Sequence, residues 1–434
     1  LGDGMGVTAT TAGRIYSNMK DGLWEHTPLA WENWPFSGLA KTHCSNKHTT
    51  DSAASATAYL TGTKAPWGTS GVGPEIERFD CPGSVAISQS ESIAKWAQDA
   101  GMWTGLISTA RITHASPAAL YAHSADRTWE GSVPAEDDPN GECMDIAQQL
   151  VDTLPGSELR LLLGGGRKNL QFRPDGRNLT AEWLELGGNR AYISTLAEAD
   201  TFDVESSDYL MGLFQNSHMM YQLDEDSDFD KDQPSLTDMV DLAIRFLSRA
   251  PNGYFLFVEG GRIDHAFHGS MAHLGMEETR EFTHAIAHAD TITDPADTLM
   301  ITTADHTHAW TTVAYPDRHN DIFDPFDQAA LDGKPLMFMA FSNGPGGREH
   351  AGGAPRRDFY TVDTQDSHFL QPAFMGRQIG THGTEDVGIW ARGPMSHLYE
   401  GSIENNFIPH AMARALCIGP SAHWCPEPRP WGAK

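Results

Sequence analysis

The sequence predicts an α/β protein, a three-layer sandwich in which a central, mostly parallel sheet lies between layers of helices. Short apolar runs recur along the 434-residue chain, and a helix-like amphipathic stretch follows each of them. The runs are apolar throughout, which is typical of parallel strands that are buried on both faces. Hydrophobic residues make up 40% of the chain and charged residues 20%, so a full core is available and global disorder is excluded. No window approaches the roughly 18 uncharged apolar residues that a membrane-spanning helix needs.

Individual elements follow from periodicity and capping residues. The clearest predicted strands are Trp103–Ser108, Leu159–Leu163, Tyr254–Val258 and Thr298–Thr302, and a later one is Val387–Ala391. We expect helices from about Ser84 to Ala100, Ser235 to Arg249, Met276 to Ala289 and Phe407 to Leu416. Gly101 is a C-cap residue for the first of these, and Ser235 with Asp238 forms a capping-box pattern at the start of the second.

The strand and helix order breaks between residues 321 and 380, which are rich in Gly, Pro, Asp and Arg. We interpret this stretch as an inserted subdomain or surface cap. The α/β core then comprises residues 1–320 and resumes at 381–434. The chain starts with Leu1-Gly2-Asp3-Gly4, which resembles the end of a strand and its turn. We therefore expect the natural chain to extend upstream, where any signal peptide would lie.

The charge balance excludes some classes of binding partner. There are 58 acidic against 30 basic residues, a formal net charge of −28, and Lys supplies only 9 of the bases. Such a surface repels nucleic acid and anionic membranes. An acid-rich, Lys-poor surface is compatible with high salt, because salt screens the repulsion between its like charges. One interpretation is therefore a marine or halophilic source. An ordinary acidic secreted enzyme is the alternative.

Five cysteines allow at most two disulfides and one spare thiol. We interpret Cys81–Cys143 and Cys417–Cys425 as disulfides and Cys44 as free, which implies an oxidising, secreted or periplasmic location. Five reduced thiols in a cytosolic enzyme are the alternative.

Carboxylates and imidazoles follow several predicted strands at the point where each strand ends. The carboxylates and imidazoles are Asp3, His114, Glu259, Asp264, His265, His268, Asp305, His306, His308 and His382, the last of which precedes a strand. Ser116 and Arg111 lie in the same segment as His114. Ligands bind beyond the carboxyl ends of strands in open α/β sheets, so we expect these side chains to converge. Carboxylate with imidazole is the ligand set of catalytic zinc and neighbouring hard cations. Asp264 and His268 lie one helical turn apart, so both can reach one ion.

Ser52 is the candidate nucleophile. The Ala-rich run after it favours a helix that Gly62 can terminate, so Ser52 lies at a helix N-terminus, where an anion is stabilised. From this segment alone, a simple N-cap role is the alternative. Arg127 is a candidate clamp for phosphate oxygens, against the alternative of a surface salt bridge.

These residues lie in blocks that resemble the signature blocks of the alkaline phosphatases, and most closely those of the animal and crustacean type. The blocks are Gly2-Asp3-Gly4-Met5-Gly6, the run Asp51 to Ala58, Thr113 to Pro117, Val258 to His265, Thr303 to His306 and Thr381-His382-Gly383. They occur in the family's order and span nearly the whole chain. Residues 321–380 occupy the place of the family's crown subdomain, so the resemblance implies that the inserted subdomain is crown-like.

The resemblance implies a role for each matching residue. Asp264, His268 and His382 would hold one zinc ion, and Asp3, Ser52, Asp305 and His306 a second. Asp3, Ser116 and Glu259 would hold magnesium, with His114 binding a water of that ion. Arg127 would grip phosphate, while Asp51, His265 and His308 would lie just beyond the ligands. Tyr315 would reach the partner subunit of a homodimer, and the two cysteine pairs match family disulfides.

The chain also departs from the family pattern. Ile379-Gly380 replaces an acidic pair before His382. Glu182 and Phe214 match positions of a calcium site, and Asp232 supplies a loosely aligned third. However, Gln215 stands where the family has glutamate, and a solvated acidic loop around 224–232 is the alternative.

The resemblance implies hydrolysis of phosphate monoesters through a phosphoserine at Ser52, with inorganic phosphate as the product. Two alternatives stay open from the sequence: a phosphodiesterase or sulfatase of the same superfamily, and a non-catalytic protein that binds phosphate or metal. Ser52 is followed by Ala-Ala-Ser rather than a sulfatase pattern, and Glu259 with Ser116 supplies the third metal set that diesterases tend to lack.

Overall fold

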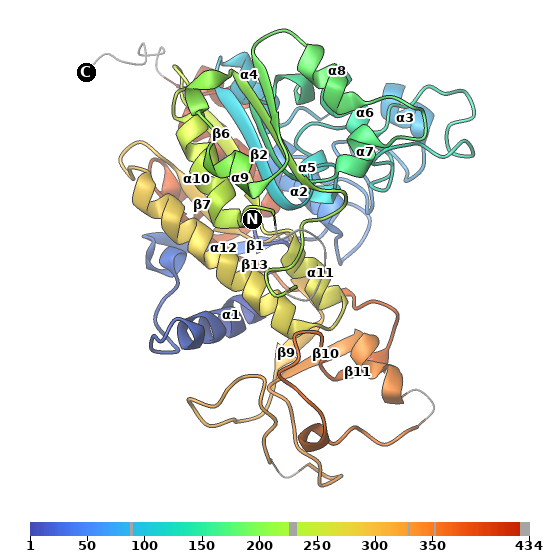
Figure 1. The fold of residues 1–434 in the computed structure, drawn as a ribbon, viewed down its shortest axis with the longest axis vertical. Coiled ribbons are helices and arrows are strands. Elements are labelled where there is room, and N and C mark those ends of the chain that lie inside the picture. Colours follow the sequence, from blue (N-terminus) through green and yellow to red (C-terminus); the bar gives the residue numbers. More distant parts are fainter. Residues whose placement is uncertain (87–89, 225–231, 329, 351–352, 426–434) are drawn as a thin grey trace.

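Five parallel strands form one part of the central sheet (Figure 1). In this computed structural model, residues 1–434 are described except 87–89, 225–231, 329, 351–352 and 426–434. The strand order is β4-β5-β3-β2-β6, and every neighbouring pair is parallel. The bounds are β2 Trp103–Arg111, β3 Leu161–Gly165, β4 Arg190–Ile193, β5 Tyr209–Gln215 and β6 Tyr254–Glu259.

Four further strands continue the sheet in the order β14-β1-β13-β7. They are β1 Phe36–Lys41, β7 Met300–Thr303, β13 Val387–Arg392 and β14 Gly401–Glu404. Strand β13 is antiparallel to both of its neighbours, whereas β1 and β14 are parallel. Gly2 makes parallel bridges to Gly260, just after β6, and to Ala304, just after β7, so it joins the two parts. The start of the chain is thereby fixed between two strand ends.

Helices cover both faces of this sheet. Successive residues of β3 point to opposite cores: Leu161 and Leu163 belong to one, and Leu162 to the other. The helices are α1 Val7–Lys20, α2 Ser52–Thr61, α3 Cys81–Ala86, α4 Ile93–Asp99, α5 Ala115–Ala118, α6 Ile146–Asp152, α7 Arg167–Gln171, α8 Leu179–Glu185, α9 Leu196–Asp200, α10 Leu236–Leu247, α11 Arg262–His268, α12 Ala272–Ile292 and α13 Ile408–Leu416. Helices α1, α10 and α12 pack in the first core, and α2, α4, α6 and α13 in the second. The predicted three-layer α/β class is confirmed.

Most predicted elements are present, but the single helix predicted from Ser84 to Ala100 is wrong. Helix α3 ends at Ala86, and α4 begins only at Ile93. Ser92 starts the new helix because its Oγ accepts the Lys95 N–H at 3.4 Å and itself donates to the Leu120 carbonyl at 2.6 Å. Residues 87–89 lie outside the described ranges.

Other boundaries shift by a few residues. The predicted capping box opens α10, where Ser235 and Asp238 exchange backbone and side-chain hydrogen bonds of 2.9 and 3.2 Å. Strands β3 and β7 each begin two residues later than predicted, because the preceding residues Leu159 and Thr298 close hydrogen-bonded turns.

A separate small sheet occupies the lower part of Figure 1. It has the order β11-β10-β9, from Ala373–Gly376, Met339–Gly344 and Trp310–Thr312. A satellite cluster of Met337, Phe359 and Phe369 is buried beside it. Strands β10 and β11 lie inside the predicted insertion 321–380, while β9 precedes it. The division of the chain at residues 320 and 381 stays a prediction.

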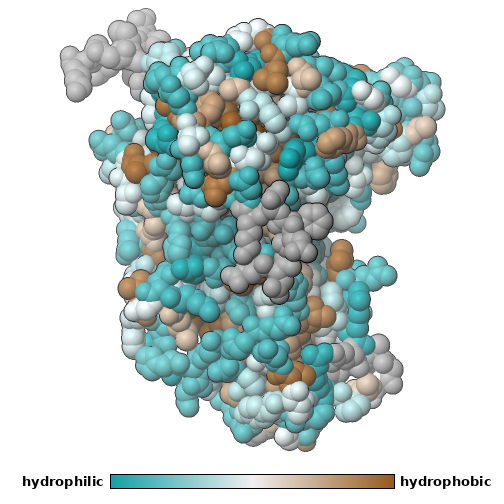
Figure 2. Space-filling view, in the orientation of Figure 1, coloured by the Kyte–Doolittle hydropathy of each residue, from teal (hydrophilic) through white to brown (hydrophobic). Residues whose placement is uncertain are grey.

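Both predicted disulfides are present, at Cys81–Cys143 and Cys417–Cys425, and Cys44 is free and buried. The face in Figure 2 is largely hydrophilic, with apolar residues scattered over it. Across the described ranges, no helix combines the length and apolarity that crossing a membrane requires.

Candidate active site

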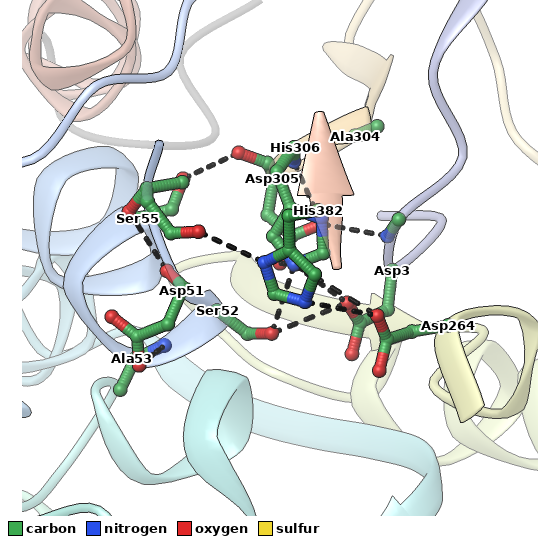
Figure 3. Close-up of polar contacts among 12 residues, drawn as sticks. Asp3, Asp51, Ser52, Ala53, Ser55, Asp264, Ala304, Asp305, His306 and His382 are labelled. Carbon is green, nitrogen blue, oxygen red and sulfur yellow. Dashed lines mark hydrogen bonds and ion pairs between the residues drawn. The ribbon is translucent and has the colours of Figure 1, made fainter. Parts of the chain in front are cut away.

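Ser52 is the first residue of α2 (Figure 3), and all residues of this helix are buried. Asp51 is the N-cap, and its carboxylate accepts the N–H groups of Ala53 and Ala54 at 3.3 and 3.4 Å. Gly62 ends the helix with φ +83°, as the sequence predicts. The hydroxyl of Ser52 therefore lies where the helix dipole and free N–H groups favour negative charge.

One cluster of ligand atoms is formed by Asp264, His268 and His382. Asp264 and His268 share α11, and His382 lies on the short strand β12 His382–Gly383, paired with β8 Thr307–His308. The Nε2 atoms of the two histidines are 3.0 Å apart, and they lie 3.4 and 3.5 Å from Asp264 Oδ1. The structure thus brings the three predicted ligands of the first zinc ion within reach of one point.

The opposite nitrogens of these histidines explain how the rings are oriented. His268 Nδ1 lies 2.6 Å from the Gly380 carbonyl, and His382 Nδ1 lies 2.8 Å from the Thr50 carbonyl. Donation from Nδ1–H to a carbonyl fixes the tautomer and leaves a lone pair on each Nε2. Two lone pairs and a carboxylate that face one another suit a cation.

A second cluster surrounds the Ser52 hydroxyl, at the end of β7 and at the chain start. Ser52 Oγ lies 3.1 Å from His306 Nε2 and 3.4 Å from Asp3 Oδ1. His306 Nε2 is in turn 3.2 Å from Asp305 Oδ2 and 3.5 Å from Asp3 Oδ1. All four predicted ligands of the second zinc ion therefore converge. Two sets of residues in this region have the mutual spacing of metal ligands: Asp3, Asp305 and His306; and Asp264, His306, His308 and His382.

Several buried polar atoms here have no hydrogen-bond partner. They are Asp3 Oδ2, Asp305 Oδ2, Glu259 Oε1, Ser116 Oγ and His114 Nδ1. Such atoms are costly to bury unpaired, and they belong to the donor types that Zn²⁺ and Mg²⁺ take. The residues present thus fit divalent cations at this edge of the sheet.

The pKa values show how unfavourable the crowded carboxylates are without a counter-charge. Burial raises the pKa of Asp305 to about 6 and that of Glu259 to about 7. Burial, together with the neighbouring Asp305 and Asp264 carboxylates, raises the pKa of Asp3 well above its ordinary value. Asp264 differs: burial raises its pKa, but His268 and His308 outweigh burial and hold the pKa well below the ordinary value.

Arg127 points at the same site. Its Nη1 donates to Asp51 Oδ2 at 3.0 Å, and its Nη2 lies 3.4 Å from His114 Nε2. Asp51 also accepts the Gly68 N–H at 2.8 Å. One carboxylate thus fixes both the start of the Ser52 helix and the guanidinium beside it.

His218 is a neighbour that the sequence analysis missed. Its ring lies 5.0 Å from that of His114 and 4.2 Å from that of His265, and the three could together hold an ion. His218 follows β5, so the strand-end rule that singled out the other ligands could have found it. Ser55, whose Oγ donates to the Asp305 carbonyl at 2.7 Å, carries no comparable signal in the sequence.

The three residues expected at a calcium site each have other partners in the structure. Glu182 is bound by Arg177 at 2.5 Å, and the Phe214 carbonyl accepts Arg167 Nη2 at 2.9 Å. Asp232 Oδ1 accepts the Leu196 N–H. The calcium site therefore stays a prediction. Residues 225–231 of the acidic run lie outside the described ranges.

Tyr315 lies outside the site and is 87% exposed.

Comparisons with known proteins point to one family. The family model described as alkaline phosphatase matches residues 1–418. The tissue-nonspecific alkaline phosphatase isozyme of Gallus gallus is 40% identical, covering 98% of this chain and 85% of its own length. The alkaline phosphatase of Gadus morhua is 39% identical over 96% of this chain and 91% of its own. The cold-active alkaline phosphatase of a Shewanella species shares the fold, with a TM-score of 0.68 at 24% identity, covering 96% of this chain and 98% of the other.

Proposed function

Since the chain belongs to the alkaline phosphatase family and is a phosphoric monoester hydrolase, we propose that Ser52 is its nucleophile and that hydrolysis proceeds through a phosphoserine. The observation that carries this proposal is the position of Ser52 Oγ. It lies at the N-terminus of α2, within 3.4 Å of two candidate metal ligands, and the preceding residue Asp51 pairs with Arg127.

The proposed cofactors are two zinc ions and one magnesium ion. Asp264, His268 and His382 would hold the first zinc, and Asp3, Ser52, Asp305 and His306 the second. Asp3, Ser116 and Glu259 would hold magnesium, with His114 beside it. When bound, these ions would supply positive charge that lowers the pKa of the nucleophile and neutralises the entering and leaving oxygens. The unpaired buried oxygens support this assignment. A calcium ion has no such support.

The protein's own groups account for the two displacements. Ser52 loses its hydroxyl proton to solvent and its Oγ attacks phosphorus in line, forming an O–P bond while the bond to the leaving oxygen breaks and that oxygen takes a proton from solvent water. Water then attacks the same phosphorus and gives up a proton to solvent, the Ser52 O–P bond breaks, Ser52 Oγ is protonated again by solvent, and inorganic phosphate leaves. Arg127 offers two parallel N–H donors to the phosphoryl oxygens, and a loose transition state needs chiefly this positioning. The N-terminus of α2 stabilises the anionic phosphoserine between the two steps.

We further propose a homodimer that is secreted or periplasmic. Two disulfides favour an oxidising compartment. Tyr315 and Phe374 are exposed by 87% and 85% in and beside the small sheet, which suits a surface that a second copy covers. The net charge of −28 suits a salt-adapted enzyme that does not bind nucleic acid.

Turnover of p-nitrophenyl phosphate by the zinc- and magnesium-loaded enzyme tests the proposal. We expect Ser52→Ala to lose at least about 10³-fold in kcat. Ser55→Ala, one turn further along the same helix, should lose far less. If Ser52→Ala keeps full turnover, the phosphoserine mechanism is wrong.

A second substrate separates the alternatives. Bis-p-nitrophenyl phosphate should be hydrolysed much more slowly than the monoester. Preference for the diester would favour the phosphodiesterase, and no turnover of either ester by the loaded protein would favour a binding protein.

A further inference from the structure

Arginine and aromatic side chains alternate along the amino-terminal edge of the five-stranded sheet. The guanidinium carbon of Arg160 lies 5.1 Å from the centre of the Trp103 ring and 4.1 Å from that of Tyr209. The guanidinium of Arg190 lies 3.7 Å from Tyr209 and 4.8 Å from Trp183. Trp103, Arg190 and Tyr209 are the first residues of β2, β4 and β5. The stack is therefore built on the strand starts, opposite the strand ends that carry the active site.

An open cavity of ≈ 680 Å³ lies against this stack. Arg160, Arg190 and Tyr209 line it together with the apolar side chains of Val151 and Leu186. The wall of the cavity thus offers two cationic groups and an apolar surface.

Neither guanidinium makes an ion pair with a carboxylate within the part of the chain that the structure describes, although Glu158 is near enough to raise the pKa of Arg190 in part. Arg160 Nη1 donates to the Asp208 carbonyl at 3.3 Å. Arg190 donates to the carbonyls of Gly187 and Ser157, both at 3.1 Å, and its Nη1 is buried with no hydrogen-bond partner. Burial lowers the pKa of Arg190. In a chain with almost twice as many acids as bases, two such cations side by side are unexpected.

The acidic residues around the cavity are already engaged. Asp152 pairs with Arg177 at 2.9 Å, and Glu158 accepts the Tyr209 hydroxyl at 2.6 Å. Asp208 Oδ2 accepts the Asn189 N–H at 3.4 Å. Three carboxylates thus line the cavity against two guanidiniums, so its positive charge is local to the guanidinium edges of Arg160 and Arg190.

We propose that this cavity binds a small oxyanion, a carboxylate or a phosphate, through the N–H edges of Arg160 and Arg190. All N–H donors of a guanidinium lie in its plane. Arg160 Nη1 and Arg190 Nε and Nη2 already donate to carbonyls, so the donors proposed for a ligand are Nε and Nη2 of Arg160 and Nη1 of Arg190. In-plane pairs of N–H groups match the two oxygens of a carboxylate or phosphate. Val151 and Leu186 would contact the apolar body of the ligand. The site is distinct from the catalytic centre, and its occupancy leaves Ser52 accessible.

Calorimetric titration of the zinc- and magnesium-loaded enzyme tests the site. Terephthalate is the carboxylate probe, because it joins two carboxylates through an apolar ring. Inorganic phosphate is the second probe, and any equivalent beyond the one that fills the active site is counted. The variants are Arg160→Met and Arg190→Met, with Arg190→Lys as a milder change. Arg245→Met is the matched control, since Arg245 pairs with Asp241 on α10 away from the cavity.

We expect one terephthalate per chain, bound about 10- to 100-fold more weakly by each Met variant and unchanged by Arg245→Met. A second phosphate equivalent that is lost in the same variants, without terephthalate binding, would support the site and identify phosphate as its anion. Circular dichroism checks that each variant is folded. If Arg190→Met is not folded, Arg190→Lys is measured in its place. The proposal is overturned if neither probe binds the wild type at about 10 mM, or if binding survives the Arg160 and Arg190 changes.

Discussion

Asp51 shows how a single buried side chain connects the parts of the site. Its carboxylate accepts backbone N–H groups at the start of α2, the Gly68 N–H and a guanidinium N–H of Arg127. The nucleophile and the phosphate clamp therefore share one support. A fixed distance between them matters because phosphoryl transfer depends on positioning more than on covalent chemistry.

Replacing Arg127 tests its role as the clamp. Arg127→Ala should raise KM for p-nitrophenyl phosphate by about 10- to 100-fold, because two charge-assisted hydrogen bonds to phosphate are lost. Arg127→Lys should have a smaller effect, since it keeps the charge but not the paired donors. Steady-state kinetics beside Arg245→Ala measures the difference, and an unchanged KM in Arg127→Ala would contradict the assignment.

Glu278 on α12 should make stability depend on pH. Burial raises its pKa to about 7, so the folded state favours the protonated form. This contribution to stability is complete below the unfolded pKa near 4.5 and is lost as the pH rises through 7. Glu278→Gln removes the charge and retains an acceptor for the Gln222 N–H, which Glu278 accepts at 2.8 Å. The variant should be more stable than the wild type by about 2–3 kcal/mol at pH 8 and nearly equal at pH 4.5. Urea unfolding at several pH values measures this, and a difference that does not vary with pH would refute the explanation.

At the scale of elements, the C-terminus of α2 is as constrained as its start. Gly62 has φ +83°, and a Cβ there would lie 2.3 Å from His410 Nε2. Gly22 has φ +68° with nothing within 4 Å of the added carbon, so it is a matched control for backbone strain alone. Gly22→Ala should cost about 1 kcal/mol and Gly62→Ala about 2–4 kcal/mol in the free energy of unfolding. Equal losses in the free energy of unfolding, measured in urea, would show that the His410 ring moves aside at no cost, which would contradict this explanation.

The sequence predicted those elements whose pattern is local. The capping box of α10, the buried strands β2 and β6 and the helical spacing of Asp264 and His268 all follow from neighbouring residues. Convergence of the ligands followed from one topological rule, since parallel strands end at a common edge. The break before α4 was missed because Ser92 is held by the carbonyl of Leu120, which is distant in sequence. The arrangement of β9 to β11 was missed because short strands separated by long loops carry little periodicity.

At the scale of the whole molecule, the proposed dimer makes a prediction about mass. The loaded enzyme should sediment at twice the 47.5 kDa mass of the chain. Phe374→Asp, on β11, should shift it toward the monomer, because burying the new charge between subunits is costly. Phe172→Asp, an equally drastic change at an exposed residue beyond α7, should not. A monomeric wild type would remove the proposed role of Tyr315.

The most direct test of the account is whether phosphate becomes covalently attached to Ser52. Loaded enzyme is mixed with a phosphate monoester, quenched in acid and digested, and the peptides are analysed by mass spectrometry. We predict one phosphoryl group on Ser52, and none at that position in Ser52→Ala, which should also lack turnover. Full turnover with no phosphorylated Ser52 at any quench time, or with the phosphoryl group on another side chain, would contradict the account.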